Sequence, residues 1–247
     1  MDSFDQKKHG QVIDNFLKDL SDTQGDAFIL KGGTALLKCY NLDRFSEDID
    51  LDGKRKNIQE FIRKFCKKYG YTYRIAKDTD TVKRAFINYG ENKPLKVEVS
   101  YRRRNIPHEQ YTKINGISVY TIDRLCQMKS SAYESRDKIR DLYDLCYIGD
   151  KYYDKLSDST KIRLQDALEY KGLEQFDYII QNNEDPLIDK DKLAEKFLNL
   201  YDKVGLLYDK SENNMSVDIE KNKSKPLQKR KLKLDIKPHN NSKDFTR

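Results

Sequence analysis

Three aspartates occupy alternate positions in the stretch FSEDIDLDG, at Asp48, Asp50 and Asp52. In a strand, successive side chains point to opposite faces, so the three carboxylates would share one face while Ile49 and Leu51 share the other. Carboxylates about 7 Å apart repel each other unless a cation lies between them. Mg²⁺ takes hard oxygen ligands and binds through one or two carboxylates together with substrate phosphates. The spacing therefore predicts a metal-binding strand, with a solvated acidic face as the alternative.

A glycine turn precedes this strand. The stretch KGGTAL, residues 31–36, comes between a predicted strand and a predicted helix. Gly33 would let the backbone approach a phosphate, the helix N-terminus would offer free N–H donors, and Thr34 would add a hydroxyl. The turn matches neither the P-loop nor the GxGxxG pattern, and taken alone it is also compatible with a simple tight turn. Because consecutive elements tend to be neighbours, we expect the turn and the aspartates to face one cleft.

A further carboxylate lies in the segment LKVEVSY. Strand alternation there places Lys96 and Glu98 on one face and Val97 and Val99 on the other. Glu98 is therefore a candidate third ligand for a site with two metal ions, which would hold the attacking and the leaving oxygen. The alternative is an exposed glutamate.

The stretch KSSAYESRDKIRDLYD combines cations with carboxylates. On one continuous helix, four side chains would lie along one stripe: Lys129, Arg136, Arg140 and Asp144. Three cations on one stripe could hold a triphosphate. The alternatives are a solvated charged face and an ordinary Arg140–Asp144 pair one turn apart. Asp141 lies off the stripe, where it would orient the arginines or belong to a helix break near Ser135.

Three consecutive arginines follow the Glu98 strand, at Arg102, Arg103 and Arg104. In an extended chain at least one of them would face the acidic side, where it could contact nucleic-acid phosphate. A solvated loop is the alternative.

The elements that must position these residues follow from the hydrophobic periodicity. It predicts helices over residues 12–20, 31–40 and 57–70, and strands over residues 27–30, 71–77, 82–90 and 95–103, with the aspartate strand between them. From residue 121 the pattern is helical, with later segments near residues 158–170, 173–181 and 189–203. We therefore expect an α+β protein: a mixed-sheet domain over residues 1–120, a helical bundle domain over residues 121–210 and a tail over residues 211–247.

Composition indicates a highly charged protein, with 36% charged and 37% hydrophobic residues among 247. No apolar run approaches the length of a membrane span and no signal peptide is evident, so we expect a cytoplasmic protein without a membrane partner. The four cysteines have no zinc-site spacing and are expected to be reduced and mostly buried. The net charge of +7 comes from residues 221–247, which hold ten basic and two acidic side chains. This tail is expected to be extended, either as a solubilising end or as an RNA contact.

In chain order, the stretches KGGTAL, RFSEDIDL, KVEVS and KSSAYESRDKIRDLYDL resemble the AbiEii/AbiGii toxin family over about residues 27–148. These nucleotidyltransferases belong to the DNA-polymerase-β-like superfamily and act as toxins in abortive-infection and type IV toxin–antitoxin systems. The resemblance implies a polymerase-β-like fold for the first domain. It also implies that Gly33 and Thr34 meet the nucleotide phosphates, with Thr34 in place of the usual Ser, and that Asp48 and Asp50 bind metal. The helical motifs match at Lys129, Arg136, Arg140, Asp141 and Asp144, where the lysine contacts the NTP and a terminal aspartate takes part in catalysis.

Some members of this family, the MenT-like toxins, add nucleotides to the 3′ end of tRNA. The resemblance therefore implies transfer of NMP from an NTP to RNA, with two Mg²⁺ ions and a separately encoded antitoxin as partner. Two rival functions remain open. One is a small-molecule nucleotidyltransferase of the aminoglycoside-modifying kind, and the other is a catalytically silent protein that binds nucleotide or RNA through the same residues.

Overall fold

The computed structural model describes residues 5–54 and 57–207. All of these residues belong to one compact unit, whose strands precede residue 121 and whose later elements are helical. In chain order the elements are α1 (Gln6–Gln24), β1 (Phe28–Lys31), α2 (Gly32–Tyr40), β2 (Ile49–Gly53), α3 (Ile58–Tyr69), β3 (Thr72–Asp78), β4 (Val82–Asn88), β5 (Leu95–Ser100), η1 (His108–Gln110), β6 (Tyr111–Ile114), β7 (Ile117–Tyr120), α4 (Ile122–Ser135), α5 (Ile139–Tyr152), η2 (Tyr153–Lys155), α6 (Asp158–Asn182) and α7 (Lys190–Lys203).

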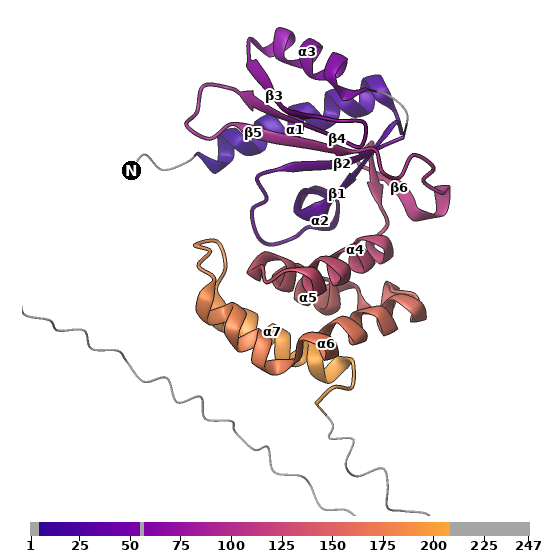
Figure 1. The fold of residues 1–247 in the computed structure, drawn as a ribbon, viewed down its shortest axis with the longest axis vertical. Coiled ribbons are helices and arrows are strands. Elements are labelled where there is room, and N and C mark those ends of the chain that lie inside the picture. Colours follow the sequence, from indigo (N-terminus) through magenta and orange to yellow (C-terminus); the bar gives the residue numbers. More distant parts are fainter. Residues whose placement is uncertain (1–4, 55–56, 208–247) are drawn as a thin grey trace, which may run out of the picture. The chain divides into compact units, whose positions relative to one another are not determined.

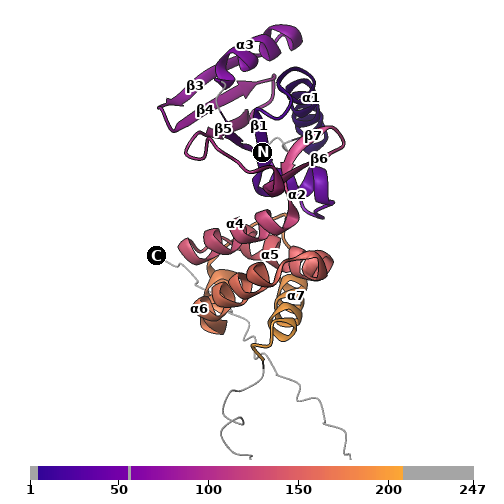
Figure 2. The ribbon, with the colours of Figure 1, turned by 90° about the vertical axis from the view of Figure 1, so that its right-hand side faces the viewer.

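The described strands form one mixed sheet in the order β3-β4-β5-β2-β1-β7-β6 (Figures 1 and 2). The aspartate strand β2 lies at its centre, antiparallel to β1 and parallel to β5. The predicted α+β class with a mixed sheet followed by helices is confirmed. A central position matters for the site because side chains from both neighbouring strands can reach Asp50.

The hairpin of β6 and β7 was not predicted. Its turn is Asn115-Gly116, and both residues have positive φ, at 51° and 82°. Asn-Gly is the preferred pair for a two-residue hairpin turn because both residues tolerate this left-handed backbone. The dipeptide, flanked by short apolar segments, was therefore a usable signal.

Helices α1 and α3 pack against each other beside the sheet (Figure 1). Helix α3 begins after Asn57, whose side chain accepts from the backbone N–H of Gln59, and ends at Gly70 in a left-handed conformation. The rings of Phe61 and Phe65 each lie 5.1 Å from the ring of Phe16 on α1. The apolar faces predicted for both helices therefore form the core on this side.

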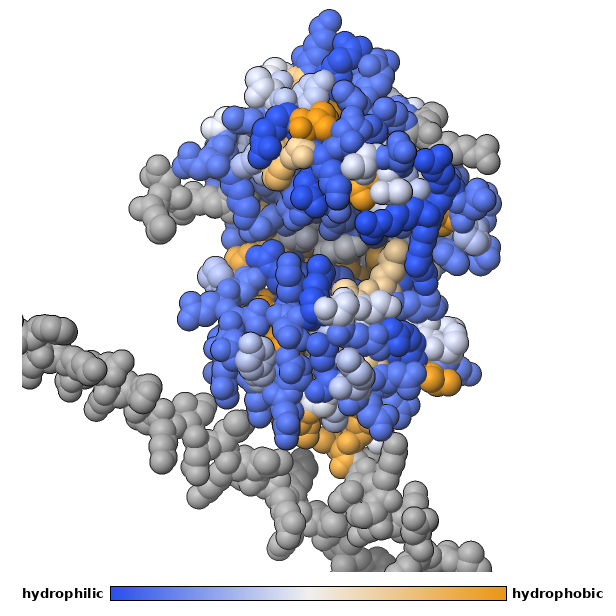
Figure 3. All heavy atoms as spheres, in the orientation of Figure 1, coloured by the Kyte–Doolittle hydropathy of each residue, from blue (hydrophilic) through white to orange (hydrophobic). Residues whose placement is uncertain are grey.

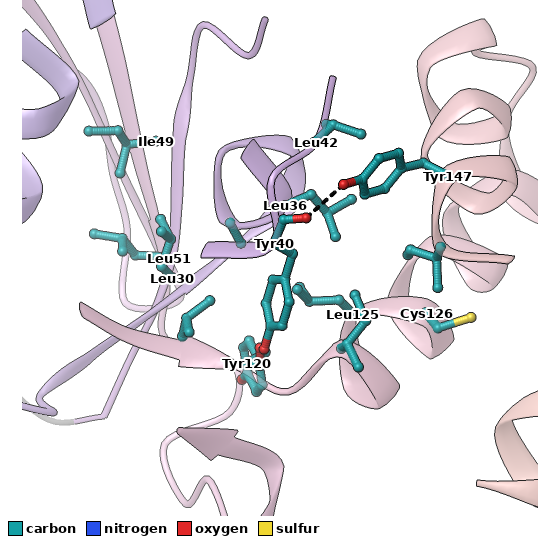
Figure 4. Packing of buried hydrophobic residues seen from close by; sticks show 14 of the residues in the cluster. Leu30, Leu36, Tyr40, Leu42, Ile49, Leu51, Tyr120, Leu125, Cys126 and Tyr147 are labelled. Atoms are coloured by element: carbon teal, nitrogen blue, oxygen red, sulfur yellow. Dashed lines mark hydrogen bonds between the residues drawn. The ribbon is translucent and has the colours of Figure 1, made fainter. Parts of the chain in front are cut away.

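The helices α4–α7 begin directly after β7. Helix α4 contacts α2, α5 and α6, and α5 contacts α7. Figure 4 shows how Leu125 and Tyr147 of this part pack with Leu36 and Tyr40 of α2. One hydrophobic core thus continues from the sheet into the helices, and the domain boundaries at residues 120 and 210 stay a prediction.

Two helix breaks interrupt the helical part. Gly172 has a φ of 68° inside α6, which separates the segments predicted over residues 158–170 and 173–181. The stripe drawn on one continuous helix through Lys129 and Asp144 was wrong, because α4 ends at Ser135 and α5 begins at Ile139; the alternative, a helix break near Ser135, is confirmed. Extended backbone at Arg136 makes this break.

The surface agrees with the charged composition. Figure 3 shows a mainly hydrophilic face with scattered apolar residues. Among residues 5–54 and 57–207, none of the helices has the length and apolar character required to cross a bilayer. All four cysteines are free, and three of them are buried. The predicted basic tail, residues 211–247, lies outside the described residues.

Candidate active site

Asp50 is the centre of the site. On the open face of the sheet it lies opposite Lys31 of β1 and Glu98 of β5. Among the described residues, none donates a hydrogen bond to its carboxylate or forms an ion pair with it. Burial raises the pKa of Asp50, and the nearby Asp48 carboxylate adds to the rise. Asp50 is half-buried, and a partly desolvated carboxylate without a partner favours a bound cation.

Asp52 differs from Asp48 and Asp50. Its carboxylate is buried, forms an ion pair with Lys31 and accepts a hydrogen bond of 2.7 Å from the hydroxyl of Tyr120. Its charge is therefore neutralised within the fold. The candidates for a ligand are then Asp50 and Asp48, of which Asp48 also pairs with Lys96.

The glycine turn lies against the aspartates, as the sequence predicted. A Cβ at Gly32 would lie 2.8 Å from Oδ2 of Asp50, and the φ of Gly32 is +74°. A Cβ at Gly33 would lie 2.8 Å from Oγ of Ser46 and 3.1 Å from Nη2 of Arg44. Both positions therefore require glycine, because backbone and side chains approach closely here.

Thr34 holds the loop that precedes β2. Its side chain is buried, and its hydroxyl donates to the backbone carbonyl of Asp48 and lies 3.0 Å from Oγ of Ser46. The hydroxyl predicted to meet phosphate is thus engaged in fixing Asp48. Ser46, whose Oγ lines the neighbouring cavity, was not singled out by the sequence.

Lys129 lies at the centre of a buried charge cluster. Its Nζ is 3.1 Å from Oδ1 of Asp141 and 2.6 Å from Oδ2 of Asp144. Asp144 also forms an ion pair with Arg44, whose Nη2 lies 2.6 Å from Oδ1. Asp141 forms an ion pair with Arg136, whose Nε lies 2.6 Å from Oδ2. The cluster alternates cations and carboxylates, so each charge is held in place by the next one.

The helix break before α5 arranges this cluster. Because the chain is extended at Arg136, its guanidinium folds back onto Asp141 in the first turn of α5. Arg140 does not join the cluster. It pairs with Asp185, and its Nη1 lies 3.7 Å from Oε2 of Glu47.

Two cavities meet at Asp50, Lys129 and Arg136. The larger, of about 610 Å³, lies on the β1 side and includes Lys31, Gly32 and Met128 in its lining. Besides Asp50, all of its charged lining residues are basic: Lys31, Arg103, Arg124, Lys129, Arg136 and Arg163. The smaller, of about 340 Å³, has a mixed lining that includes Gly33, Ser46, Asp48, Arg84, Lys96, Glu98 and Arg140.

Glu98 and Lys96 border the aspartates on β5. Nε of Arg84 lies 2.6 Å from Oε2 of Glu98, and Nζ of Lys96 lies 2.5 Å from Oδ2 of Asp48. Among the described residues, no three His, Cys, Asp or Glu side chains are grouped closely enough to hold a metal ion. Asp48 and Asp50 are hard carboxylates of the kind that bind Mg²⁺, which uses one or two of them together with substrate phosphates. The role of Glu98 as a third ligand stays a prediction.

The three arginines that follow β5 lie in different places. Arg103 lines the larger cavity beside Asp50. Arg104 donates to the backbone carbonyl of Asp80 at 3.4 Å and lines a different pocket, while Arg102 is exposed. Only Arg103 therefore comes to the site, and the RNA-binding role of the triplet stays a prediction.

Several cations of the site were not predicted. Strand alternation places Lys96 on the same face as Glu98. It likewise places Arg84 on the same face as Phe86 in the neighbouring strand β4. Arg44 could not be found by spacing, because its partner Asp144 lies 100 positions further along the chain.

Comparisons with known proteins agree with this geometry. The model of the family described as nucleotidyl transferase AbiEii toxin, type IV TA system, matches residues 15–217. The structure is similar to JHP933 from Helicobacter pylori, with a TM-score of 0.67 and 25% identity over 82% of this chain and 92% of that one. A candidate nucleotidyltransferase from H. pylori gives 0.66 and 26%, over 84% and 99%. The fold is also that of MenT4, a nucleotidyltransferase toxin from Mycobacterium tuberculosis, with 0.50 and 18% over 84% and 86%. A comparison with curated proteins finds no significant match.

Proposed function

The chain belongs to the AbiEii family of type IV nucleotidyltransferase toxins, and from this premise we propose that it transfers NMP from an NTP to the 3′ end of an RNA in a Mg²⁺-dependent reaction. The proposed RNA is tRNA, and the proposed consequence is inhibition of translation and growth. A separately encoded antitoxin is the expected partner, and the cytoplasm is the expected location. The observation that carries the proposal is the Asp50 carboxylate, which has no hydrogen-bond or ion-pair partner among the described residues, lies against the glycine turn and lines both the basic and the mixed cavity.

The nucleotide is proposed to enter from the larger cavity. Its six cations can bind phosphates, and the apolar side chains of Leu125, Met128 and Ala132 can contact a base. The N-terminus of α2 at Gly32 and Gly33 adds backbone N–H groups beside Asp50. Lys129 and Arg136 reach both cavities, and Arg140 lines the smaller one, so together they are proposed to hold the triphosphate.

Asp48 and Asp50, with Glu98 as a further candidate, are the residues proposed to hold divalent metal. When bound there, Mg²⁺ would neutralise phosphate charge and favour the deprotonated acceptor hydroxyl. Asp48 and Asp50 offer hard carboxylate oxygens, and Nζ of Lys96 lies 2.5 Å from Oδ2 of Asp48, so this position already pairs a carboxylate with a cation. The donor set therefore fits the metal.

The transfer is an in-line displacement. The acceptor oxygen forms a bond to the α-phosphorus, the bond from this phosphorus to the bridging oxygen breaks, and pyrophosphate leaves with the electron pair. The proton of the acceptor hydroxyl passes to solvent. Catalysis is then mainly positioning and charge neutralisation by Lys129, Arg136 and the turn.

Asp141 and Asp144 are proposed as positioning residues. Asp144 is fully buried, and its two oxygens face Arg44 and Lys129. The oxygens of Asp141 are likewise taken by Lys129 and Arg136. A carboxylate that holds two cations is poorly placed to accept a proton from an RNA hydroxyl, so of the two roles open from sequence the structure favours orientation.

The direct test incubates the full chain with total RNA and each α-labelled NTP in turn, with Mg²⁺ and then with EDTA. We expect label on RNA that is lost with EDTA and with Asp50→Asn. Asp14→Asn, which removes an exposed carboxylate paired with Lys38, is the matched control and should keep the activity. Labelling that survives EDTA or Asp50→Asn would contradict the mechanism.

The same assay separates the rival functions. Adding an aminoglycoside as a small polyol amine gives the alternative acceptor, and label on it with RNA unlabelled would show that the acceptor assignment is wrong. Growth inhibition in cells distinguishes a silent binder, which would remain toxic after Asp48→Ala with Asp50→Ala. The enzyme should lose toxicity in that variant while its thermal unfolding stays cooperative.

A further inference from the structure

A second group of side chains continues from the site across the open face of the sheet. The strand registers define two rows, one of which runs Lys77–Arg84–Glu98–Asp50 from β3 to β2. The other runs Arg74–Phe86–Lys96 and ends at Asp48, which Lys96 contacts. Strands are about 4.8 Å apart, so Arg74 lies about 14 Å from the strand that carries the aspartates. This distance is within reach of the last nucleotides of a bound strand.

Phe86 is an aromatic residue on this open face. Its neighbours in β4, Ala85 and Ile87, are buried in the core, so the ring of Phe86 points to the opposite side, where it is only half-buried. The guanidinium of Arg74 lies 4.3 Å from the ring centroid. An aromatic ring beside arginine on a sheet is a common surface for stacking an unpaired base.

The cations around Phe86 are only partly neutralised. Arg84 pairs with Glu98 and Lys96 pairs with Asp48. Among the described residues, Arg74 and Lys77 have no carboxylate partner. The surface is therefore cationic at the sheet edge and becomes mixed toward the aspartates, which complements a phosphate backbone that ends at the metal site.

In-line chemistry assigns a direction to this surface. If the leaving pyrophosphate lies at Gly32 and Gly33, on the β1 side of Asp50, the attacking oxygen must approach from the opposite side. The sheet order places β5, β4 and β3 on that side. The row that contains Phe86 therefore lies on the approach path of the acceptor.

We infer that Phe86 and Arg74 form a stacking platform for the single-stranded 3′ end of the RNA acceptor, with Lys77, Arg84 and Lys96 along its phosphates. This inference rests on the proposed function and adds the binding surface for the acceptor. It separates the acceptor, on β3–β5, from the nucleotide, in the larger cavity.

The test measures steady-state transfer by the full chain to an RNA hairpin with a single-stranded 3′ overhang. Phe86→Ala should raise the KM for this RNA about tenfold, equivalent to about 1.4 kcal/mol, and leave the KM for NTP unchanged. Phe86→Trp, which keeps a stacking ring, should restore the wild-type KM. Phe86→Leu, which keeps apolar volume without an aromatic face, should behave like Phe86→Ala and guards against a folding defect.

Matched controls come from other surfaces. Tyr170 is an aromatic residue that is 76% exposed on α6, and Arg63 is an exposed arginine on α3. Tyr170→Ala and Arg63→Ala should leave the RNA KM unchanged. Arg74→Gln should lower the slope of log KM against log salt concentration by about 0.7, the value for one phosphate contact on a single strand.

The outcomes distinguish this inference from the function on which it rests. If the wild-type protein labels no RNA, the proposed function fails and the platform fails with it. If it labels RNA but Phe86→Ala and Phe86→Leu keep the wild-type RNA KM, the platform alone is wrong. An equal rise in the KM for NTP, or no rescue by Phe86→Trp, would also overturn it. The inference is also wrong if Phe86→Ala and Phe86→Leu impair only the binding of a protein partner and leave the KM for RNA unchanged.

Discussion

Replacing Asp144 by asparagine tests whether this residue holds the cation cluster. The side chain is fully buried, with Nε of Arg44 at 2.8 Å and Nη2 at 2.6 Å from Oδ1, and with Nζ of Lys129 at 2.6 Å from Oδ2. Asp144→Asn keeps the shape and removes the charge. Lys129 would retain Asp141 at 3.1 Å, whereas Arg44, only 6% exposed, would keep no carboxylate partner among the described residues.

The expected cost follows from the cation that is left behind. Removing one partner of a buried ion pair typically destabilises a protein by about 3–5 kcal/mol, because the remaining charge stays desolvated. In a unit of about 200 residues this lowers the melting temperature by about 6–20 °C. Arg44→Met with Asp144→Asn removes that charge as well, so the double variant should be less destabilised than the sum of the single variants.

Urea unfolding followed by circular dichroism measures these free energies, with transfer activity measured well below the melting temperature. The control is Asp14→Asn, whose exposed pair with Lys38 should contribute no more than about 1 kcal/mol. If Asp144→Asn is as stable as this control but has lost transfer activity, the positioning role is refuted. Asp144 would then act directly on the substrate.

Two further predictions concern the N-terminal part. Burial lowers the pKa of His9 from 6.5, so the native state favours the neutral ring while the unfolded chain binds a proton below that pH. The free energy of unfolding should therefore fall as the pH drops below 6.5, by at most about 1.4 kcal/mol per pH unit. Urea denaturation of His9→Gln should show a flatter dependence of this free energy on pH. Equal slopes for the two proteins would contradict the prediction. Gly32→Ala should reduce transfer activity far more than Gly25→Ala. Both have positive φ, +74° and +60°, but only the first new methyl would meet Asp50. Equal activity of the two variants would refute the contact.

Local sequence patterns were sufficient to predict where the carboxylates of the site lie. Alternation around Asp50 and Glu98 predicted two strands with acidic faces, and the glycine turn before α2 was expected to face them. These inferences succeed because strand periodicity and neighbouring connections are encoded within about twenty residues.

The cation half depended on contacts that local patterns do not contain. The stripe of cations was drawn on a continuous helix, and the helix break near Ser135 was only an alternative; the structure has this break at residues 136–138, with the Arg136–Asp141 pair formed across it. Arg44 stands in a segment without periodicity, and the carboxylate with which it pairs is the distant Asp144. Spacing arguments fail here because tertiary pairing between distant residues decides where each charge lies.

The contacts of α5 also explain how the two halves are held together. The hydroxyl of Tyr147 donates to the backbone carbonyl of Tyr40 at 2.8 Å (Figure 4), and the hydroxyl of Tyr143 donates to Oδ1 of Asp43 at 2.7 Å. With the pair of Arg44 and Asp144, these bonds fix the loop between α2 and β2 to the helix that also carries Asp141. The loop leads directly into the strand that carries the candidate metal ligand Asp50, so any shift of α5 would displace the candidate phosphate-binding cations and the carboxylates together. A motif that looks catalytic in sequence can therefore be required for activity through its hold on this loop, without touching the substrate.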